Sequence, residues 1–402
     1  MKRLAGWLGL VGAVLLGVAA GAGAMYGVAA HAPYLWVLVL AGVAVAALLA
    51  AALARWPARW ARLRPRRAAV CAGLAAMLPF FGLVAAVAMT PERTPIKGLQ
   101  DPRGPHAQLR VDTGSTLATW RIAPDGARRG TPVVFLHGGP GSYVRTRDFE
   151  VGAGLRDAGF ETVYFDQAGS GASADLPIFD YSIARAVADV EALRKALQAD
   201  RMVLWGQSWG ASLAAAYVLT HPDRVAGVVF ESPGDFPGAP ARLDYTATDQ
   251  AVPFSPTPRD AVLYLLINYA PQLADAWMPQ AEHHAYNDAI GAGRDFRGYQ
   301  CKGAGPIERP ASSGGSSLYA HQRLLGDLAA QPLVAASALR APALVIRGEC
   351  DFIDGPTARR YVQAFGATLV EPPGVGHGLF GHDGTLSALL GTFARESLAG
   401  VQ

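Results

Sequence analysis

The chain has 402 residues and a formal net charge of +3; 51% of its residues are apolar, 17% are charged and three are cysteine. This composition excludes a disordered chain, a collagen-like repeat and a small disulfide-dense protein, and so few charges form no basic stripe for nucleic acid. The charges are unevenly divided. Residues 1–90 contain eight Lys or Arg and no acidic residue, whereas residues 91–402 carry 27 basic and 32 acidic residues, a net of −5.

Three uncharged, apolar stretches lie within residues 1–90. Each is long enough to cross the hydrocarbon core of a bilayer, which takes about 20 apolar residues. With a break at His31-Ala32-Pro33, we predict transmembrane helices at about 5–30, 34–54 and 68–90. Because these stretches contain no acidic or basic residue that would mark a transport path, we expect them mainly to anchor the chain in a lipid bilayer.

The arginines predict the orientation of these helices. Six of them lie in the short segment 55–67, and Lys2 and Arg3 precede the first span. Short loops rich in Lys and Arg stay on the cytoplasmic side, so we predict a multi-pass protein whose residues beyond 90 lie on the non-cytoplasmic side. If residues 1–24 are instead a cleaved signal peptide, the other two spans keep the same orientation.

Residues 91–108 combine prolines with charges and are predicted to be a linker. From 109 to 402, short apolar runs alternate with helical periodicity, which is typical of an α/β fold with a mostly parallel sheet and helices on both faces. Ser182 is the predicted N-cap of one of these helices. The runs that we predict to be strands are Thr131–His137, Thr162–Asp166, Met202–Gly206, Val225–Glu231, Ala343–Arg347 and, more weakly, Ala367–Glu371.

Residues 236–338 interrupt this alternation with proline clusters and helical pieces rich in Tyr, Leu and Trp, so we predict a helical cap inserted between two core strands. Cys301 in this insertion and Cys350 would lie outside the cytoplasm, where a disulfide can form; the sequence leaves this pairing open. Neighbouring His283 and His284 point to different faces of a helix, unlike the i, i+4 spacing of a zinc site. We therefore expect no metal and no cofactor.

Gly206-Gln207-Ser208-Trp209-Gly210 follows one predicted strand and precedes an apolar helical run, Ala211–Leu219. A Gly-x-Ser-x-Gly turn in this position holds its serine in a strained conformation above the sheet. A serine hydroxyl becomes a good nucleophile when a neighbouring base takes its proton. We therefore predict Ser208 as the nucleophile of a serine hydrolase.

The acid and the base of such a site follow the serine along the chain. Asp351 comes directly after one predicted strand, and His377 comes after the last one. Asp354 and His382 are nearby alternatives, but they lie further from the strand ends. We predict a catalytic triad in which His377 is the base and Asp351 orients it.

A further motif, His137-Gly138-Gly139-Pro140-Gly141, stands at the end of the first predicted strand. Glycine-rich backbone at this place can point N–H groups at a developing negative charge. We expect Gly138 and Gly139, together with the backbone N–H of Trp209, to line an oxyanion hole.

These motifs, together with Asp166-Gln167-Ala168-Gly169-Ser170-Gly171, resemble the proline iminopeptidase family of α/β-hydrolases. The resemblance covers about 109–235 and 340–390. It implies an α/β-hydrolase fold, the triad and oxyanion groups named above, and an exopeptidase that releases N-terminal residues, often proline, from short peptides or amides.

The sequence departs from the family pattern at two motif positions and in the cap. Ala168 stands where the family usually has Arg, and Gln207 where it has a second Gly. The cap has no adjacent Trp-Glu pair to grip the substrate amine, because Trp277 and Glu282 are five residues apart. A carboxylate must pair with the ammonium of a free N-terminus, and the candidates for this substrate-binding role are Glu282 and Glu231.

Two activities fit these residues. The first is a membrane-anchored serine peptidase, an aminopeptidase that acts on small peptides or amides outside the cytoplasm. The alternative is an esterase or lipase that hydrolyses acyl esters near the membrane, which an apolar cap without an amine-binding carboxylate would favour. The intact motifs disfavour a catalytically idle receptor.

Overall fold

The computed structural model describes residues 1–29, 35–88, 102–248, 314–333 and 339–401, together with scattered positions between 263 and 307. Contacts divide the chain into two compact units. One comprises Met1–Glu92 with Ser255–Pro279, and the other Arg93–Phe254 with Gln280–Gln402. The predicted break at 31–33 and most of the predicted linker lie outside the described residues.

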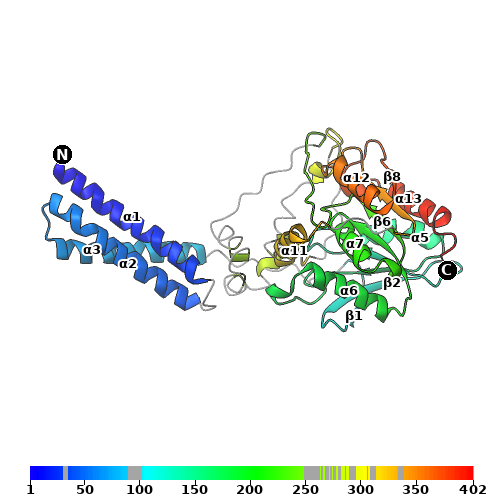
Figure 1. The fold of residues 1–402 in the computed structure, drawn as a ribbon, viewed down its shortest axis with the longest axis horizontal. Coiled ribbons are helices and arrows are strands. Elements are labelled where there is room, and N and C mark those ends of the chain that lie inside the picture. The colour runs from blue at the N-terminus through cyan, green and yellow to red at the C-terminus, as the bar shows by residue number, and fades with distance from the viewer. Residues whose placement is uncertain are drawn as a thin grey trace. The chain divides into compact units, whose positions relative to one another are not determined.

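Three long apolar helices lie in the described part of the first unit: α1 (Lys2–Ala29), α2 (Leu35–Trp60) and α3 (Pro65–Ala88) (Figure 1). Their membrane-length stretches have mean hydropathies of 2.0, 2.8 and 1.8, so all three are long and apolar enough to cross a membrane. They overlap the three predicted spans. Gly17 of α1 allows close approach to α2, because a Cβ there would lie 2.6 Å from the carbonyl oxygen of Ala46.

An eight-stranded sheet forms the centre of the second unit, with the strands in the order β1-β2-β4-β3-β5-β6-β7-β8. β1 and β2 pair antiparallel with their neighbours, and all other neighbouring strands are parallel. The predicted α/β class and all six predicted strands are confirmed. The strands are β1 (Ala107–Arg110), β2 (Thr116–Ile122), β3 (Val133–Leu136), β4 (Thr162–Phe165), β5 (Met202–Gln207), β6 (Val225–Glu231), β7 (Ala343–Ile346) and β8 (Thr368–Val370).

Strands β1 and β2 were absent from the predicted set. β1 begins at Ala107, inside the segment predicted as a linker, and most of its side chains are exposed. It is the edge strand of the sheet, so it carries no apolar run of the kind that reveals a buried strand. Pairing with β2, from Ala107 opposite Thr119 to Arg110 opposite Thr116, defines it instead.

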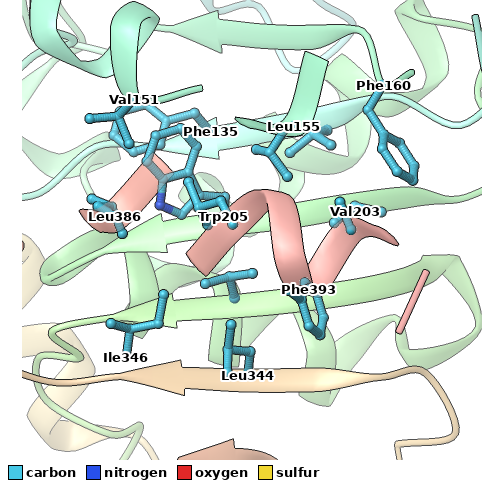
Figure 2. Close-up of a cluster of buried hydrophobic side chains, with 14 of the residues drawn as sticks. Phe135, Val151, Leu155, Phe160, Val203, Trp205, Leu344, Ile346, Leu386 and Phe393 are labelled. Carbon is cyan, nitrogen blue, oxygen red and sulfur yellow. The ribbon is translucent and has the colours of Figure 1, made fainter. Parts of the chain in front are cut away.

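Helices cover both faces of the sheet. On one face, Trp205 of β5 packs with Leu155 and Phe393, which come from two of these helices (Figure 2). On the other, the ring of Phe230 in β6 stacks on that of Phe365, with centroids 5.1 Å apart. The described helices are α4 (Thr146–Val151), α5 (Ala153–Asp157), α6 (Ile183–Ala196), α7 (Trp209–Thr220), α11 (Leu318–Ala330), α12 (Gly355–Phe365) and α13 (Asp383–Glu396).

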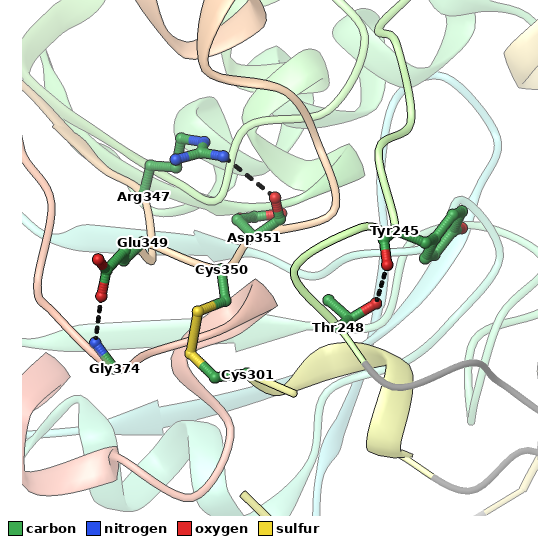
Figure 3. The surroundings of a disulfide bond; sticks show 8 residues. All are labelled: Tyr245, Thr248, Cys301, Arg347, Glu349, Cys350, Asp351 and Gly374. Atoms are coloured by element: carbon green, nitrogen blue, oxygen red, sulfur yellow. Dashed lines mark hydrogen bonds between the residues drawn. A yellow bond between two sulfur atoms is a disulfide. The ribbon is translucent and has the colours of Figure 1, made fainter. Parts of the chain in front are cut away.

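The predicted N-cap of α6 is confirmed, because the Ser182 hydroxyl accepts a hydrogen bond from the backbone N–H of Arg185 at 3.2 Å. Of the predicted cap, the structure describes a 3₁₀ turn at Phe296–Tyr299, helix α11 and several shorter pieces. Cys301 and Cys350 form a disulfide that joins the cap to the loop after β7 (Figure 3). The pairing that the sequence left open is therefore present.

Candidate active site

Ser208 occupies the tip of a tight turn between β5 and α7. Its φ of 55° lies in the left-handed region, a conformation that costs energy for a residue with a Cβ and that clusters at functional sites. A Cβ on Gly210 would lie 1.8 Å from the carbonyl oxygen of Leu136, and a Cβ on Gly206 would lie 2.3 Å from that of Gly210. Both glycines of the motif are thus needed for β3, β5 and α7 to meet at this turn.

The structure brings Ser208, His377 and Asp351 together. The Nε2 atom of His377 lies 3.0 Å from the Oγ atom of Ser208, and its Nδ1 atom lies 2.8 Å from Oδ1 of Asp351. The side chains of Asp351 and His377 are buried. Oδ1 of Asp351 also accepts the backbone N–H of Ile353 at 2.9 Å, which fixes the carboxylate. The parallel sheet explains the meeting, since the loops after β5, β7 and β8 leave the same edge.

Asp351 keeps its negative charge despite its burial. Burial alone would raise the pKa of this carboxyl, but the charge of His377 and the hydrogen bonds from His377 and Ile353 lower the pKa overall. An ionised Asp351 accepts the Nδ1–H of His377 and leaves the lone pair of Nε2 directed at Ser208.

The two alternative residues serve helix ends. Asp354 is the N-cap of α12, where its Oδ1 accepts the N–H of Thr357 at 3.1 Å and the hydroxyl of Thr357 at 2.6 Å. His382 stands at the N-terminal boundary of α13, where its carbonyl accepts the N–H of Leu386 at 3.1 Å. Their contacts account for both residues without a role beside Ser208.

The glycine-rich motif after β3 forms a loop beside the turn that carries Ser208. Gly138 faces that turn closely, because a Cβ on it would lie 2.3 Å from Oε1 of Gln207. Gly139 has a φ of 127°, a conformation that glycine adopts readily. Trp209 is the first residue of α7, so its backbone N–H has no acceptor within the helix. This placement is compatible with the predicted oxyanion hole.

Gln167 joins the loop after β3 to the turn after β5, a role that no sequence pattern predicted. Its Nε2 donates to the carbonyl of His137 at 2.9 Å, and its Oε1 accepts the indole N–H of Trp209 at 2.9 Å. Only its place in the Asp166–Gly171 motif marked it in the sequence. One side chain thereby sets the spacing between the two loops that would line an oxyanion hole.

His137 is a neutral structural histidine. Burial lowers its pKa to about 3, so the ring carries one proton. With Nδ1 donating to the carbonyl of Gly138 at 2.9 Å, Nε2 can accept the backbone N–H of Gln167 at 2.9 Å. Both ring nitrogens are therefore satisfied, and the histidine holds its loop against β4.

Glu231, a candidate for binding the substrate amine, is fully buried at the end of β6. Its Oε2 accepts the indole N–H of Trp205 at 2.7 Å, whereas Oε1 has no hydrogen-bond partner among the described residues. Burial raises the pKa of this carboxyl to about 8, although the positive charge of Arg147 opposes the rise. A carboxyl that is largely neutral near pH 7 is a poor partner for an ammonium group.

We expect Glu231→Gln to remove a pH dependence of stability. The folded protein keeps this carboxyl protonated up to about pH 8, whereas the unfolded chain ionises it above about 4.5. The wild type should therefore lose up to about 1.4 kcal/mol of unfolding free energy per pH unit across that interval. Thermal melting should show a higher Tm for the variant at pH 8 and similar Tm values at pH 5. An exposed control, Glu396→Gln, should follow the wild type, and parallel Tm profiles for all three proteins would contradict the expectation.

Glu282, the other candidate, lies half-buried in a short helical piece of the cap. It directly precedes His283 and His284, whose side chains are buried. Trp277, which lies five residues before Glu282 in the sequence, is outside the described residues.

Comparison with known proteins identifies the family to which this fold belongs. The family described as alpha/beta hydrolase fold matches residues 131–382. Proline iminopeptidase from Heyndrickxia coagulans is 37% identical over 125 residues, which cover 30% of this chain and 41% of that protein. Probable proline iminopeptidase from Streptomyces coelicolor is 37% identical over 134 residues, covering 31% of this chain and 38% of that protein.

The chain thus spans about two fifths of the length of these relatives. Among solved structures, the proline iminopeptidase of Mycobacterium smegmatis is 18% identical, with a TM-score of 0.45, over 74% of this chain and 100% of that chain. The match to the family covers more than half of the sequence, from residue 131, before β3, to residue 382, after His377. The chain belongs to the alpha/beta hydrolase fold family.

Proposed function

We propose that this protein is a serine hydrolase with Ser208 as nucleophile. The contact between Nε2 of His377 and Oγ of Ser208, 3.0 Å apart, carries the proposal. As Oγ attacks a carbonyl carbon, its proton passes to Nε2, and Asp351 stabilises the imidazolium that forms. His377 then returns the proton to the leaving group, which departs and leaves an acyl-enzyme. Water hydrolyses the acyl-enzyme by the same proton transfers in reverse.

The negative charge that develops on the carbonyl oxygen needs nearby donors. We assign this role to the backbone N–H of Trp209 and to the Gly138–Gly139 backbone. The close approach of Gly138 to Gln207 and the Gln167 bridge support the assignment, because both hold the glycine-rich loop at a fixed distance from Ser208.

For the substrate, we propose an N-terminal residue of a short peptide or amide, so that the protein is an aminopeptidase of the proline iminopeptidase type. The identity of 37% to enzymes of that name supports this choice. Glu231 is a poor candidate for binding the substrate amine, because it is buried and its pKa is raised. Glu282 is the remaining candidate for the ammonium group. An esterase is the alternative, which the missing Trp-Glu pair in the cap favours.

Three substrates distinguish these activities: an aminoacyl-anilide with a free amine, the same compound with a blocked amine, and a short acyl ester. We expect the wild type to hydrolyse the free-amine anilide far faster than the blocked one, and Glu282→Gln to raise KM for the free amine alone. Equal turnover of both anilides, or turnover of the ester only, would reject the aminopeptidase in favour of the esterase. Glu150→Gln, on α4, serves as the charge-matched control.

We further propose that α1–α3 anchor the protein in a membrane. The predicted linker 91–108 would then end where β1 begins at Ala107, and the predicted catalytic domain 109–402, extended by the start of β1 and with its cap at 236–338, would lie on the non-cytoplasmic side. The arginines near the ends of α2 and α3 support this orientation through the preference of basic loops for the cytoplasm. The Cys301–Cys350 disulfide is a second, independent support, because disulfides persist in oxidising compartments.

A reporter enzyme that is active only outside the cytoplasm tests this orientation. Fused after Gln100, it should be active, and fused after Leu63, between α2 and α3, it should be inactive. Activity in the second fusion and not in the first would place the hydrolase unit in the cytoplasm.

A further inference from the structure

A cluster of metal-binding side chains lies in the second unit, separate from Ser208 and His377. The cluster consists of Asp175, His283 and His284, whose potential ligand atoms all lie within 4.8 Å of one another. Both histidines are buried, at 0% and 2% exposure, and the carboxylate is partly exposed. The expectation that neighbouring histidines diverge fails here. Their rings lie side by side, with centroids 4.3 Å apart, and the carboxylate comes from a distant segment that spacing could not reveal.

The contacts of His284 direct its Nε2 atom at the carboxylate of Asp175. Its Nδ1 lies 3.0 Å from the carbonyl oxygen of Ser316, which can only accept, so Nδ1 carries a hydrogen. Its Nε2 lies 2.7 Å from Oδ1 of Asp175. In the neutral ring, a lone pair on Nε2 would face a lone pair of the carboxylate at this distance. Nε2 and Oδ1 therefore point at one another at a place where both can offer a lone pair to a metal ion.

We propose that Asp175, His283 and His284 bind a zinc ion. Two imidazoles and one carboxylate form a donor set that suits Zn²⁺ and leaves a fourth position for water. The bond from Nδ1 of His284 to a backbone carbonyl is the outer contact that fixes the tautomer of a zinc-binding histidine. His283 is oriented by its ring stacking on Tyr319, with centroids 3.9 Å apart.

To hold this ion the side chains must rotate slightly. The 2.7 Å between Nε2 of His284 and Oδ1 of Asp175 is shorter than the separation of two ligands in a tetrahedral zinc site, and the 4.8 Å spread of the cluster is longer than one ion can span. Zinc bonds to nitrogen and oxygen measure about 2.0–2.2 Å, so two ligand atoms on one ion lie at most about 4.4 Å apart. The side chain of Asp175 is 18% accessible, so the cluster contacts solvent at its carboxylate.

Zinc at this site would stabilise the segment Ser316–Ser317, which is hydrogen-bonded to the glycine-rich loop. His284 contacts Ser316, and the backbone N–H of the next residue, Ser317, donates to the carbonyl of Gly141 at 2.6 Å. Asp288 fixes the same segment, because it accepts the N–H of Ser316 at 2.9 Å. A zinc ion here would tie the cap to the core loop of Asp175 and stabilise the contact with Gly141.

Zinc binding to the full-length protein in detergent tests the proposal. After treatment with a chelator, the protein is titrated with Zn²⁺ alone in competition with a chromophoric chelator, and bound zinc is counted by elemental analysis. We expect one zinc ion per chain for the wild type. Asp175→Asn and His283→Phe should each weaken zinc affinity at least about 100-fold. Loss of a residue that only contacts a ligand costs about 10- to 100-fold, so the loss of a ligand itself should cost more. His283→Phe keeps an aromatic ring against Tyr319.

The control is His221→Gln, which removes a histidine at the end of α7 and should leave zinc affinity unchanged. Thermal melting supplies a second readout, since a ligand that binds the folded state raises Tm. Zinc should raise the Tm of the wild type and of His221→Gln, and not that of Asp175→Asn. If the wild type binds zinc no more tightly than Asp175→Asn, or if zinc leaves its Tm unchanged, the proposal is wrong, and a proton, not a metal ion, lies between His284 and Asp175.

Discussion

Replacing Ser208 with alanine is expected to lower kcat by about 10⁶-fold. The substitution removes the only oxygen that His377 can activate at the turn between β5 and α7, where Nε2 lies 3.0 Å from Oγ. The remaining rate would come from the oxyanion donors and from binding of the substrate, so KM should change little. Steady-state kinetics on the aminoacyl-anilide measure both constants.

The matched control for this prediction is Ser212→Ala. Ser212 lies one turn further along α7 and is fully buried, so its replacement tests the effect of losing a serine hydroxyl from the same helix. We expect its kcat to stay near that of the wild type. Ser208→Ala, in contrast, should keep almost no activity if Ser208 is the nucleophile. If the variant retains more than about a hundredth of the wild-type kcat, hydrolysis proceeds without this serine.

Asp351→Asn is expected to lower kcat by about 10⁴-fold while leaving the fold intact. An amide in place of the carboxylate can donate a hydrogen bond to Nδ1 of His377, which favours the tautomer with the proton on Nε2. That proton would then face Oγ of Ser208, and the ring could no longer accept the serine's proton. The 2.8 Å contact between Nδ1 and Oδ1 is the observation behind this expectation.

Asp354→Asn is the control that separates the two aspartates of this loop. It weakens the N-cap of α12, which should cost no more than about 1 kcal/mol of stability, since asparagine is also a good N-cap. Its kcat should match that of the wild type. A large loss of kcat in Asp354→Asn with near-normal kcat in Asp351→Asn would transfer the role of the acid to Asp354.

Effects within the triad should not add. Because Ser208, His377 and Asp351 act as a unit, the double variant Ser208→Ala/Asp351→Asn should be no slower than Ser208→Ala alone. Additive losses would mean that Asp351 contributes independently of the serine, for example through the stability of the loop that the Cys301–Cys350 disulfide joins to the cap.

The sequence by itself determined the class of fold and the place of the proposed nucleophile. Buried parallel strands appear as short apolar runs, and the Gly-x-Ser-x-Gly motif occupies five consecutive residues, so both signals are local. The three apolar helices were predictable for the same reason, since length and hydropathy are properties of a continuous segment. The proposed acid and base were also inferable, because each follows a predicted parallel strand and such loops lie at one edge of the sheet.

Only the tertiary structure decided which side chains meet across distant segments. The edge strand β1 is recognised by its partner and not by its own composition. Gln167 links two loops that its motif alone did not connect, and Glu231 proved to be buried against Trp205, where desolvation favours a neutral carboxyl. The histidines at 283 and 284 became a candidate zinc site because folding places Asp175, more than a hundred residues away, beside them. Such contacts depend on the packing of the whole unit, which local patterns do not contain.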